Sequence, residues 1–133
     1  MELGLEGKNV IVTGGGSNIG RAIVHAFAAE RCNITIAELA PSQGEKVAAE
    51  VAATNAGGRI KVIASDVGDH QQVGRMVEQS IAEFGDVDVL VNNVGWTMDR
   101  LFMEKPREEW EKEVQVNLWG AINCIQAVLP TMV

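Results

Sequence analysis

Short runs of apolar residues, rich in valine and isoleucine, alternate along this chain with longer segments in which apolar residues recur every three or four positions. The short runs cover residues 8–13, 33–37, 59–65 and 87–92, and each predicts a strand. Strands that alternate with helical patterns are typical of βαβ units and a parallel sheet. The sequence therefore predicts an α/β fold with four strands and with helices on both faces of the sheet.

Helix signals lie between these runs. Ser42 and Glu45 have the spacing of a capping box, and the two glycines at 57–58 supply a stop for the helix that it opens. Asp69 is the expected N-cap of the next helix, which has one apolar face and ends at Gly85. These signals predict one helix on each side of the third strand.

A longer amphipathic segment follows the fourth strand. Pro106 is a suitable first helical residue, and we expect a single helix over residues 106–132. Its apolar stripe consists of Trp110, Val114, Leu118, Ala121, Ile125, Val128 and Met132. Asn117 lies beside this stripe, where an unpaired amide would cost about 1 to 3 kcal/mol. We therefore expect polar partners for Asn117.

The crossover rules also predict the order of the strands. Right-handed connections place the first strand centrally, which gives a Rossmann-type parallel sheet of order 3-2-1-4. A ligand is expected at the C-terminal ends of strands one and four, where the chain reverses direction. The fourth strand is then an uncovered apolar edge, which invites aggregation. We therefore expect either that the chain continues past Val133 or that a partner chain covers this edge.

Composition narrows the class of protein. The chain has 133 residues, 47% of them hydrophobic, which is typical of a single soluble domain. A net charge of -7 disfavours a nucleic-acid surface, and the chain has neither a signal-peptide pattern nor a run of membrane-spanning length. Cys32 and Cys124 lie far apart and away from metal-ligand spacings, which favours reduced core thiols and no metal site. We expect a cytoplasmic protein without membrane or nucleic-acid partners.

The first strand leads into a glycine-rich turn that opens a helix, and this is the strongest functional signal. Such a turn brings a dinucleotide pyrophosphate to the free N–H groups of the helix N-terminus. The candidate residues are Thr13, Gly14, Gly16, Ser17, Asn18, Ile19 and Gly20. The sequence therefore predicts a dinucleotide-binding domain over residues 1–133.

Glu38 is the candidate for binding the ribose. It follows the second strand, 18 residues after Gly20, close to the spacing of about 20 expected for such an acid. Its neighbours Ala37, Leu39 and Ala40 are not basic, so that nothing there neutralises a 2′-phosphate. The sequence favours NAD over NADP as the cofactor.

Several motifs together resemble the short-chain dehydrogenases/reductases, and the resemblance covers essentially the whole chain. Residues 13–20 look like the family's T-G-x-x-x-G-x-G turn, with Asn18 in place of the middle glycine. Asparagine tolerates a left-handed backbone better than most residues do, so the turn can persist. The other matching residues are Asp66 and Val67, which resemble the adenine-contacting pair, Asn92, Asn93, Val94 and Gly95, which resemble N-N-A-G, and Asn117, which resembles the catalytic asparagine.

The resemblance implies hydride transfer between a nicotinamide and a secondary alcohol or ketone. The family's serine and Y-x-x-x-K pair lie after the long helix, and this chain contains no tyrosine. His25 and His70 are expected to face solvent and are no convincing substitutes. We therefore expect a domain truncated at its C-terminus, incomplete relative to the family's doubly wound fold, and inactive by itself.

Residues 95–99 and 108–110 resemble the branch with 3-oxoacyl thioester reductases and hydroxyacyl-CoA dehydrogenases. Trp96 is expected near the nicotinamide end, whereas Trp110 and Trp119 are expected in helix packing or at an interface. The apolar surface of helix 106–132 and the resemblance together imply a homotetramer. The alternative is a catalytically inactive dinucleotide-binding or scaffold module that a partner chain completes.

Overall fold

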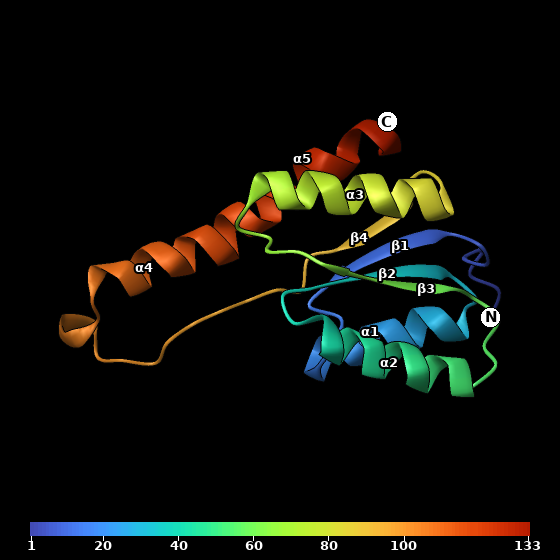
Figure 1. Ribbon diagram of the computed structural model, residues 1–133, viewed down its shortest axis with the longest axis horizontal. Helices are drawn as coiled ribbons and strands as arrows, with labels where there is room; N and C mark the ends of the chain where they lie inside the picture. The colour runs from blue at the N-terminus through green and yellow to red at the C-terminus, as the bar shows by residue number, and fades with distance from the viewer.

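The four apolar runs form one parallel sheet (Figure 1). The computed structural model describes residues 1–133. Its strands are β1 (Asn9–Thr13), β2 (Asn33–Glu38), β3 (Ile60–Ala64) and β4 (Val89–Val91), in the order β3-β2-β1-β4. Ile11 is in register with Thr35 of β2 and with Leu90 of β4. The predicted fold class and strand order are confirmed, with element ends that shift by one or two residues.

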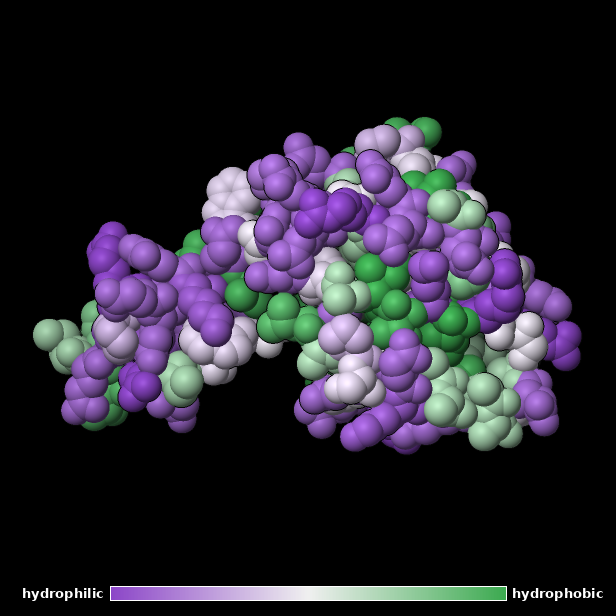
Figure 2. Space-filling model, viewed as in Figure 1, coloured by the Kyte–Doolittle hydropathy of each residue, from purple (hydrophilic) through white to green (hydrophobic).

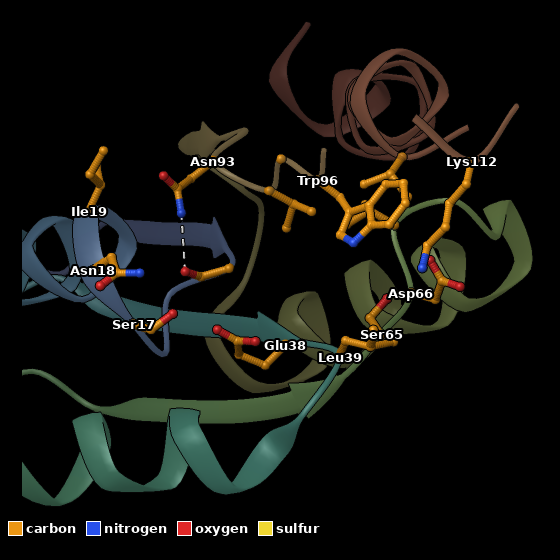
Figure 3. A pocket seen from close by; sticks show the side chains of 15 residues that line it. Ser17, Asn18, Ile19, Glu38, Leu39, Ser65, Asp66, Asn93, Trp96 and Lys112 are labelled. Atoms are coloured by element: carbon orange, nitrogen blue, oxygen red, sulfur yellow. Dashed lines mark hydrogen bonds between the residues drawn. The ribbon is translucent and has the colours of Figure 1, made fainter. Parts of the chain in front are cut away.

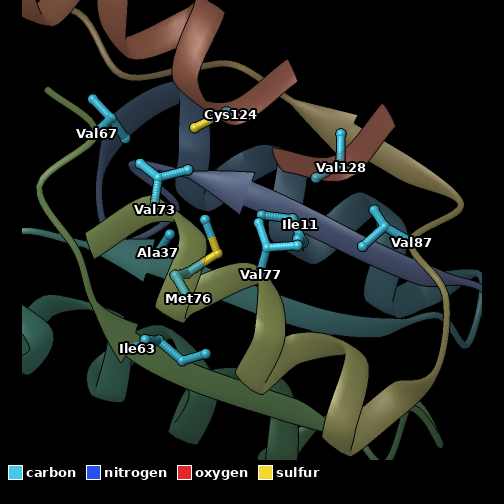
Figure 4. Packing of buried hydrophobic residues seen from close by; sticks show 10 residues of the cluster. All are labelled: Ile11, Ala37, Ile63, Val67, Val73, Met76, Val77, Val87, Cys124 and Val128. Carbon is cyan, nitrogen blue, oxygen red and sulfur yellow. The ribbon is translucent and has the colours of Figure 1, made fainter. Parts of the chain in front are cut away.

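Two helices cover each face of the sheet (Figure 1). On one face, α1 (Asn18–Ala29) and α2 (Pro41–Ala53) pack against Val10, Val12 and their neighbours. On the other, α3 (His70–Phe84) and α5 (Gly120–Met132) enclose a second cluster around Ile11 (Figure 4). Because successive side chains of a strand point to opposite faces, β1 contributes to both clusters.

The helix signals are confirmed for α3 and corrected for α2. The Asp69 side chain accepts hydrogen bonds from the N–H groups of Gln71 and Gln72, and Gly85 follows the last helical residue. In α2 the first helical residue is Pro41, so that Ser42 lies inside the first turn and caps nothing. The capping-box interpretation was wrong because the fixed backbone of proline starts the helix one residue before Ser42.

The expected single helix over residues 106–132 is divided. Pro106 precedes the first helical residue of α4 (Arg107–Val114), and a π-helical segment, η2 (Gln115–Trp119), separates α4 from α5. A π-helical turn rotates the faces of the helix relative to each other. Consequently the apolar stripe is not continuous in the core: Leu118 is 55% exposed, whereas Val128 is buried.

A protruding arm, residues 96–114, stands away from the sheet (Figure 1). It contains η1 (Phe102–Glu104) and α4. Glu113 ties its two halves together, accepting hydrogen bonds from Thr97, from the Met98 N–H and from the Lys105 ammonium. Figure 2 shows hydrophobic side chains gathered in the hollow between the arm and the body of the molecule.

The edge predicted for the fourth strand is present. β4 pairs only with β1, and all three of its residues are half-buried. Nothing else in the 133 residues pairs with its outer side. None of the helices combines the length and the apolar character that crossing a bilayer requires.

Candidate functional site

The glycine-rich turn carries the chain from β1 into α1 with two left-handed residues. Gly14 has φ +67° and Asn18 has φ +49°, so Asn18 takes the conformation expected for a residue in a glycine position. Gly20 is required for close packing, because a Cβ atom there would lie 1.9 Å from the carbonyl oxygen of Gly14. This close packing sets the N-terminus of α1 directly after β1, and Ser17, Asn18 and Ile19 at that end border a cavity, as an anion site needs.

Thr13 fastens this turn to the end of β4. Its hydroxyl donates to the Val91 carbonyl at 3.3 Å and accepts the backbone N–H groups of Asn93 at 3.0 Å and Val94 at 3.3 Å. The Asn93 amide donates to the Gly14 carbonyl at 3.1 Å (Figure 3). These bonds hold the ends of β1 and β4 together where the strand order reverses.

Glu38 joins the end of β2 to the same turn. Its Oε1 accepts a hydrogen bond of 2.6 Å from the backbone N–H of Gly16. A side chain at residue 16 would collide with this oxygen and with α2, which explains the glycine. The predicted ribose-binding carboxylate therefore faces the predicted phosphate turn.

The loop after β3 supplies Ser65, Asp66 and Val67. Asp66 Oδ1 accepts the N–H of Gly68 at 2.9 Å, and the Asp66 N–H donates to Gln72 at 3.0 Å. Ser65 is 4% exposed, and its hydroxyl is the single buried side-chain polar atom without a hydrogen-bond partner. Buried polar groups are normally paired, so this hydroxyl is available to a bound group.

These segments surround a cavity of about 530 Å³ (Figure 3), a size usual for small-molecule sites. The predicted residues that line it are Gly14, Ser17, Asn18, Ile19, Glu38, Asp66, Val67, Val94 and Gly95. Asn93 and Trp96, which the sequence also placed near the cofactor, line it as well, and the structure adds Leu39, Ser65, Lys112 and Val116. Most of the motif residues from four separate segments thus converge on one cavity.

Five predicted site residues do not line the cavity: Thr13, Gly16, Gly20, Asn92 and Asn117. Three of them shape it from behind, through the contacts described above. Asn92 is exposed and does not line the cavity. The neighbouring Asn93 lines it instead. Side chains alternate along an extended chain, so choosing between adjacent asparagines required the register of β4.

Asn117 has the polar partners predicted for it, although it is exposed rather than buried. Its Oδ1 accepts the backbone N–H of Trp96 and its Nδ2 donates to the Trp96 carbonyl, both at 2.8 Å. The π-helical turn carries Asn117 away from the buried face. The side chain therefore clamps the backbone of the loop after β4.

Trp96 and Lys112 form one wall of the cavity. The Lys112 ammonium lies 4.1 Å from the centroid of the Trp96 ring, within the range of a cation–π interaction. Lys112 is the only cationic residue that lines the cavity, which also contains the acidic side chains Glu38 and Asp66. Sequence reasoning missed Lys112 because only the packing of α4 brings it there.

The other titratable candidates lie elsewhere. His25 Nε2 is 2.8 Å from Glu50 Oε2, and hydrogen bonds from His25 and then Arg21 lower the pKa of Glu50. His70 is exposed at the start of α3. Both cysteines are buried free thiols, as predicted, and burial raises the pKa of Cys124 to about 11. Neither histidine is placed to act on a ligand in the cavity.

Comparison with known families finds a match over residues 8–133 to the family described as short chain dehydrogenase. An uncharacterized oxidoreductase of Thermotoga maritima is 39% identical over 90% of this chain and 46% of that protein. The 3-oxoacyl-[acyl-carrier-protein] reductase FabG of the same organism is 33% identical over 97% of this chain and 52% of that protein. The chain spans about half the length of these relatives.

Solved structures show the same likeness. L-Sorbose reductase from Gluconobacter frateurii, described as complexed with NADPH and L-sorbose, superposes with a TM-score of 0.92 at 30% identity. The superposition covers 99% of this chain and 50% of the reductase. The four-stranded sheet and its helices are thus similar to about half of a longer reductase.

Proposed function

Because the chain belongs to the short chain dehydrogenase family, we propose that its cavity binds NAD and that the whole protein is an NAD-dependent oxidoreductase. The observation that carries this proposal is the meeting of the glycine-rich turn, Glu38 and Asp66 at one cavity of about 530 Å³. The pyrophosphate takes the N-terminus of α1, the adenosine ribose takes Glu38, and the base lies against Asp66 and Val67.

NAD is favoured over NADP by the charge at the end of β2. A 2′-phosphate beside Glu38 would meet a carboxylate, and like charges at such short range repel. The neighbouring lining residue is Leu39, and the only lining cation, Lys112, belongs to the wall that contains Trp96. The NADPH in the sorbose reductase structure belongs to that protein, so this preference rests on the residues of the present chain.

For the whole protein we propose interconversion of a secondary alcohol and a ketone, with a hydroxyacyl or oxoacyl thioester as the substrate class. The relatives named 3-oxoacyl-[acyl-carrier-protein] reductase support the thioester class. The nicotinamide would exchange a hydride with the substrate carbon. Asn117 is proposed as a member of the proton relay, in addition to holding the Trp96 backbone. The 133 residues contain no tyrosine, so we expect them to bind NAD weakly and to turn nothing over.

Assembly and location are proposals on the same basis. Leu118, Trp119 and Leu129 are 55%, 48% and 47% exposed on the long helical segment, which favours a homotetramer through residues 106–132. Light scattering on the whole protein tests this, and a monomeric mass would refute it. Two unpaired thiols are usual for a cytoplasmic protein, and we place the protein there.

Calorimetric titration of the 133-residue chain with NADH tests the cofactor proposal. We expect one molecule bound per chain. Ile19→Asp, at a side chain that is 71% exposed and lines the cavity, should abolish binding because its charge repels the pyrophosphate. Ala26→Asp, an exposed position on α1 outside the cavity, is the matched control. Absence of binding by the unmodified chain at millimolar NADH would refute the proposal.

A further inference from the structure

One wall of the cavity consists of two side chains outside the glycine-rich turn and the ribose acid. Trp96 follows Gly95 on the loop after β4, and Lys112 projects from α4 (Figure 3). Trp96 and Lys112 are 16 residues apart in the sequence, and the ammonium lies 4.1 Å from the indole centroid. The pair therefore closes the cavity from the side of the protruding arm.

The backbone that carries the indole is held from behind by Asn117. Asn117 bonds both the N–H and the carbonyl of Trp96, each at 2.8 Å, so the backbone at this residue has little freedom to turn. The Lys112 ammonium then covers one face of the ring, which leaves the opposite face for a ligand. An aromatic face that is held in this way is ready to receive a planar group without further ordering.

The position of the wall identifies the end of the cavity to which it belongs. Lys112 lines a second, smaller recess together with Asp66 and Gly68, so it lies on the side of β3. Figure 3 shows the Trp96 indole next to Lys112 and Asp66. In a Rossmann-type sheet the adenosine half of the ligand lies on this side, beyond the acid that ends β2.

We propose that Trp96 and Lys112 form the outer wall of the adenine site. The indole stacks on the adenine base, an interaction that depends on the π-face of the base. Lys112 holds the indole and adds the one positive side chain to a cavity that otherwise carries Glu38 and Asp66, which draws in the anionic dinucleotide. The proposal rests on the proposed function. It assigns Trp96 to the adenine end of the cavity, whereas the sequence led us to expect it near the nicotinamide end.

Titration calorimetry with NADH and with ADP-ribose, which lacks the nicotinamide, tests the wall. Trp96→Leu should weaken both ligands equally, by about tenfold, and Trp96→Phe should recover most of the loss. Lys112→Met should weaken both by about threefold and flatten their salt dependence, whereas Lys112→Arg should restore binding.

Two control variants match these changes. Trp110 also lies under a lysine, with the Lys105 ammonium 4.6 Å from its ring centroid, but it does not line the cavity. Trp110→Leu should therefore leave both affinities unchanged. Lys46→Met makes the same charge change at an exposed position on α2 outside the cavity, and it should also have no effect.

The outcomes separate this inference from the function on which it rests. If the unmodified chain binds neither ligand, the proposed function fails and the wall fails with it. If the unmodified chain binds both and Trp96→Leu weakens NADH alone, the indole belongs to the nicotinamide end and the inference is overturned. Unchanged binding in both Trp96→Leu and Lys112→Met overturns it as well, while the proposed function stands.

Discussion

The carboxylate of Glu38 and the backbone N–H of Gly16 are joined by a hydrogen bond of 2.6 Å. The bond connects the end of β2 to the turn that follows β1, and it uses one oxygen of the carboxylate. The residue expected to choose between the two nicotinamide cofactors therefore also holds the turn expected to bind their phosphates. A substitution that tests the choice has to preserve the hydrogen bond.

Glu38→Gln meets this condition, because the amide oxygen can still accept from Gly16 while the charge is lost. We expect the preference for NADH over NADPH to fall by about tenfold, mainly through tighter NADPH binding, as the repulsion of the 2′-phosphate disappears. Calorimetric titration of both cofactors measures it. Glu45→Gln, exposed on α2, is the control, and an unchanged preference in Glu38→Gln would show that the carboxylate does not select the cofactor.

Thr13 is the point at which the ends of β1 and β4 are fastened. Thr13→Val keeps the shape of the side chain but removes a hydroxyl that makes three hydrogen bonds. We expect a loss of about 1 to 3 kcal/mol in the free energy of unfolding and weaker NADH binding, measured by urea denaturation and calorimetry. Thr13→Ser retains the hydroxyl and should stay within about 1 kcal/mol of the unmodified chain; equal losses in the two variants would contradict this role.

Two glycines in helices should respond to alanine in opposite directions. In Gly20→Ala the new Cβ would meet the Gly14 carbonyl oxygen at 1.9 Å, so the turn must shift and NADH binding should fall at least about tenfold. Gly74 in α3 has open space around its Cβ position, and Gly74→Ala should stabilise the chain by roughly 0.5 to 1 kcal/mol. Thermal unfolding and NADH titration of both variants check this; tight NADH binding by Gly20→Ala would refute the steric argument.

The protruding arm should respond to acid through Glu113. Hydrogen bonds from Lys105 and then from the Met98 N–H lower the pKa of Glu113 from 4.5 to about 2. Since the folded pKa is the lower one, the stabilisation is complete above about pH 4.5 and is lost as the pH falls through about 2. An NMR titration of the Glu113 carboxyl carbon should show the low pKa, and Lys105→Met should raise it. A midpoint near 4.5 in the unmodified chain would contradict the contact.

Local rules sufficed to predict the sheet and the turn. The strands were found because a parallel sheet with two covered faces needs apolar residues on both sides of each strand, as Val10, Ile11 and Val12 show. The role of Asp69 as the N-cap of α3 could be predicted because a capping side chain bonds backbone groups within three residues of itself. The convergence of Gly14, Glu38 and Asp66 on one cavity followed from the order of the strands.

The features of the site that the sequence did not predict depend on contacts between residues distant in sequence or on the phase of a helix. Asn93 is distinguished from Asn92 by its bond to Gly14, 79 residues away. Lys112 reaches the cavity because the segment that follows it changes its helical phase. The apolar periodicity of residues 106–132 gives no sign of that change, because Val114 and Leu118 continue the spacing although both are exposed.

Because of the π-helical segment, the orientation of α4 relative to α5 depends on the number of residues between them. A hydrogen bond from the Gly120 N–H to the Gln115 carbonyl spans five residues, one more than in an α-helix. Deleting one residue within 115–119 would restore a regular helix and turn α4 by about 100° relative to α5. Lys112 would then point away from the cavity, and Asn117 would lose its place behind Trp96. A change in length at the tip of the arm should therefore leave the cavity wall in place, whereas a single deletion between Val114 and Gly120 would change it.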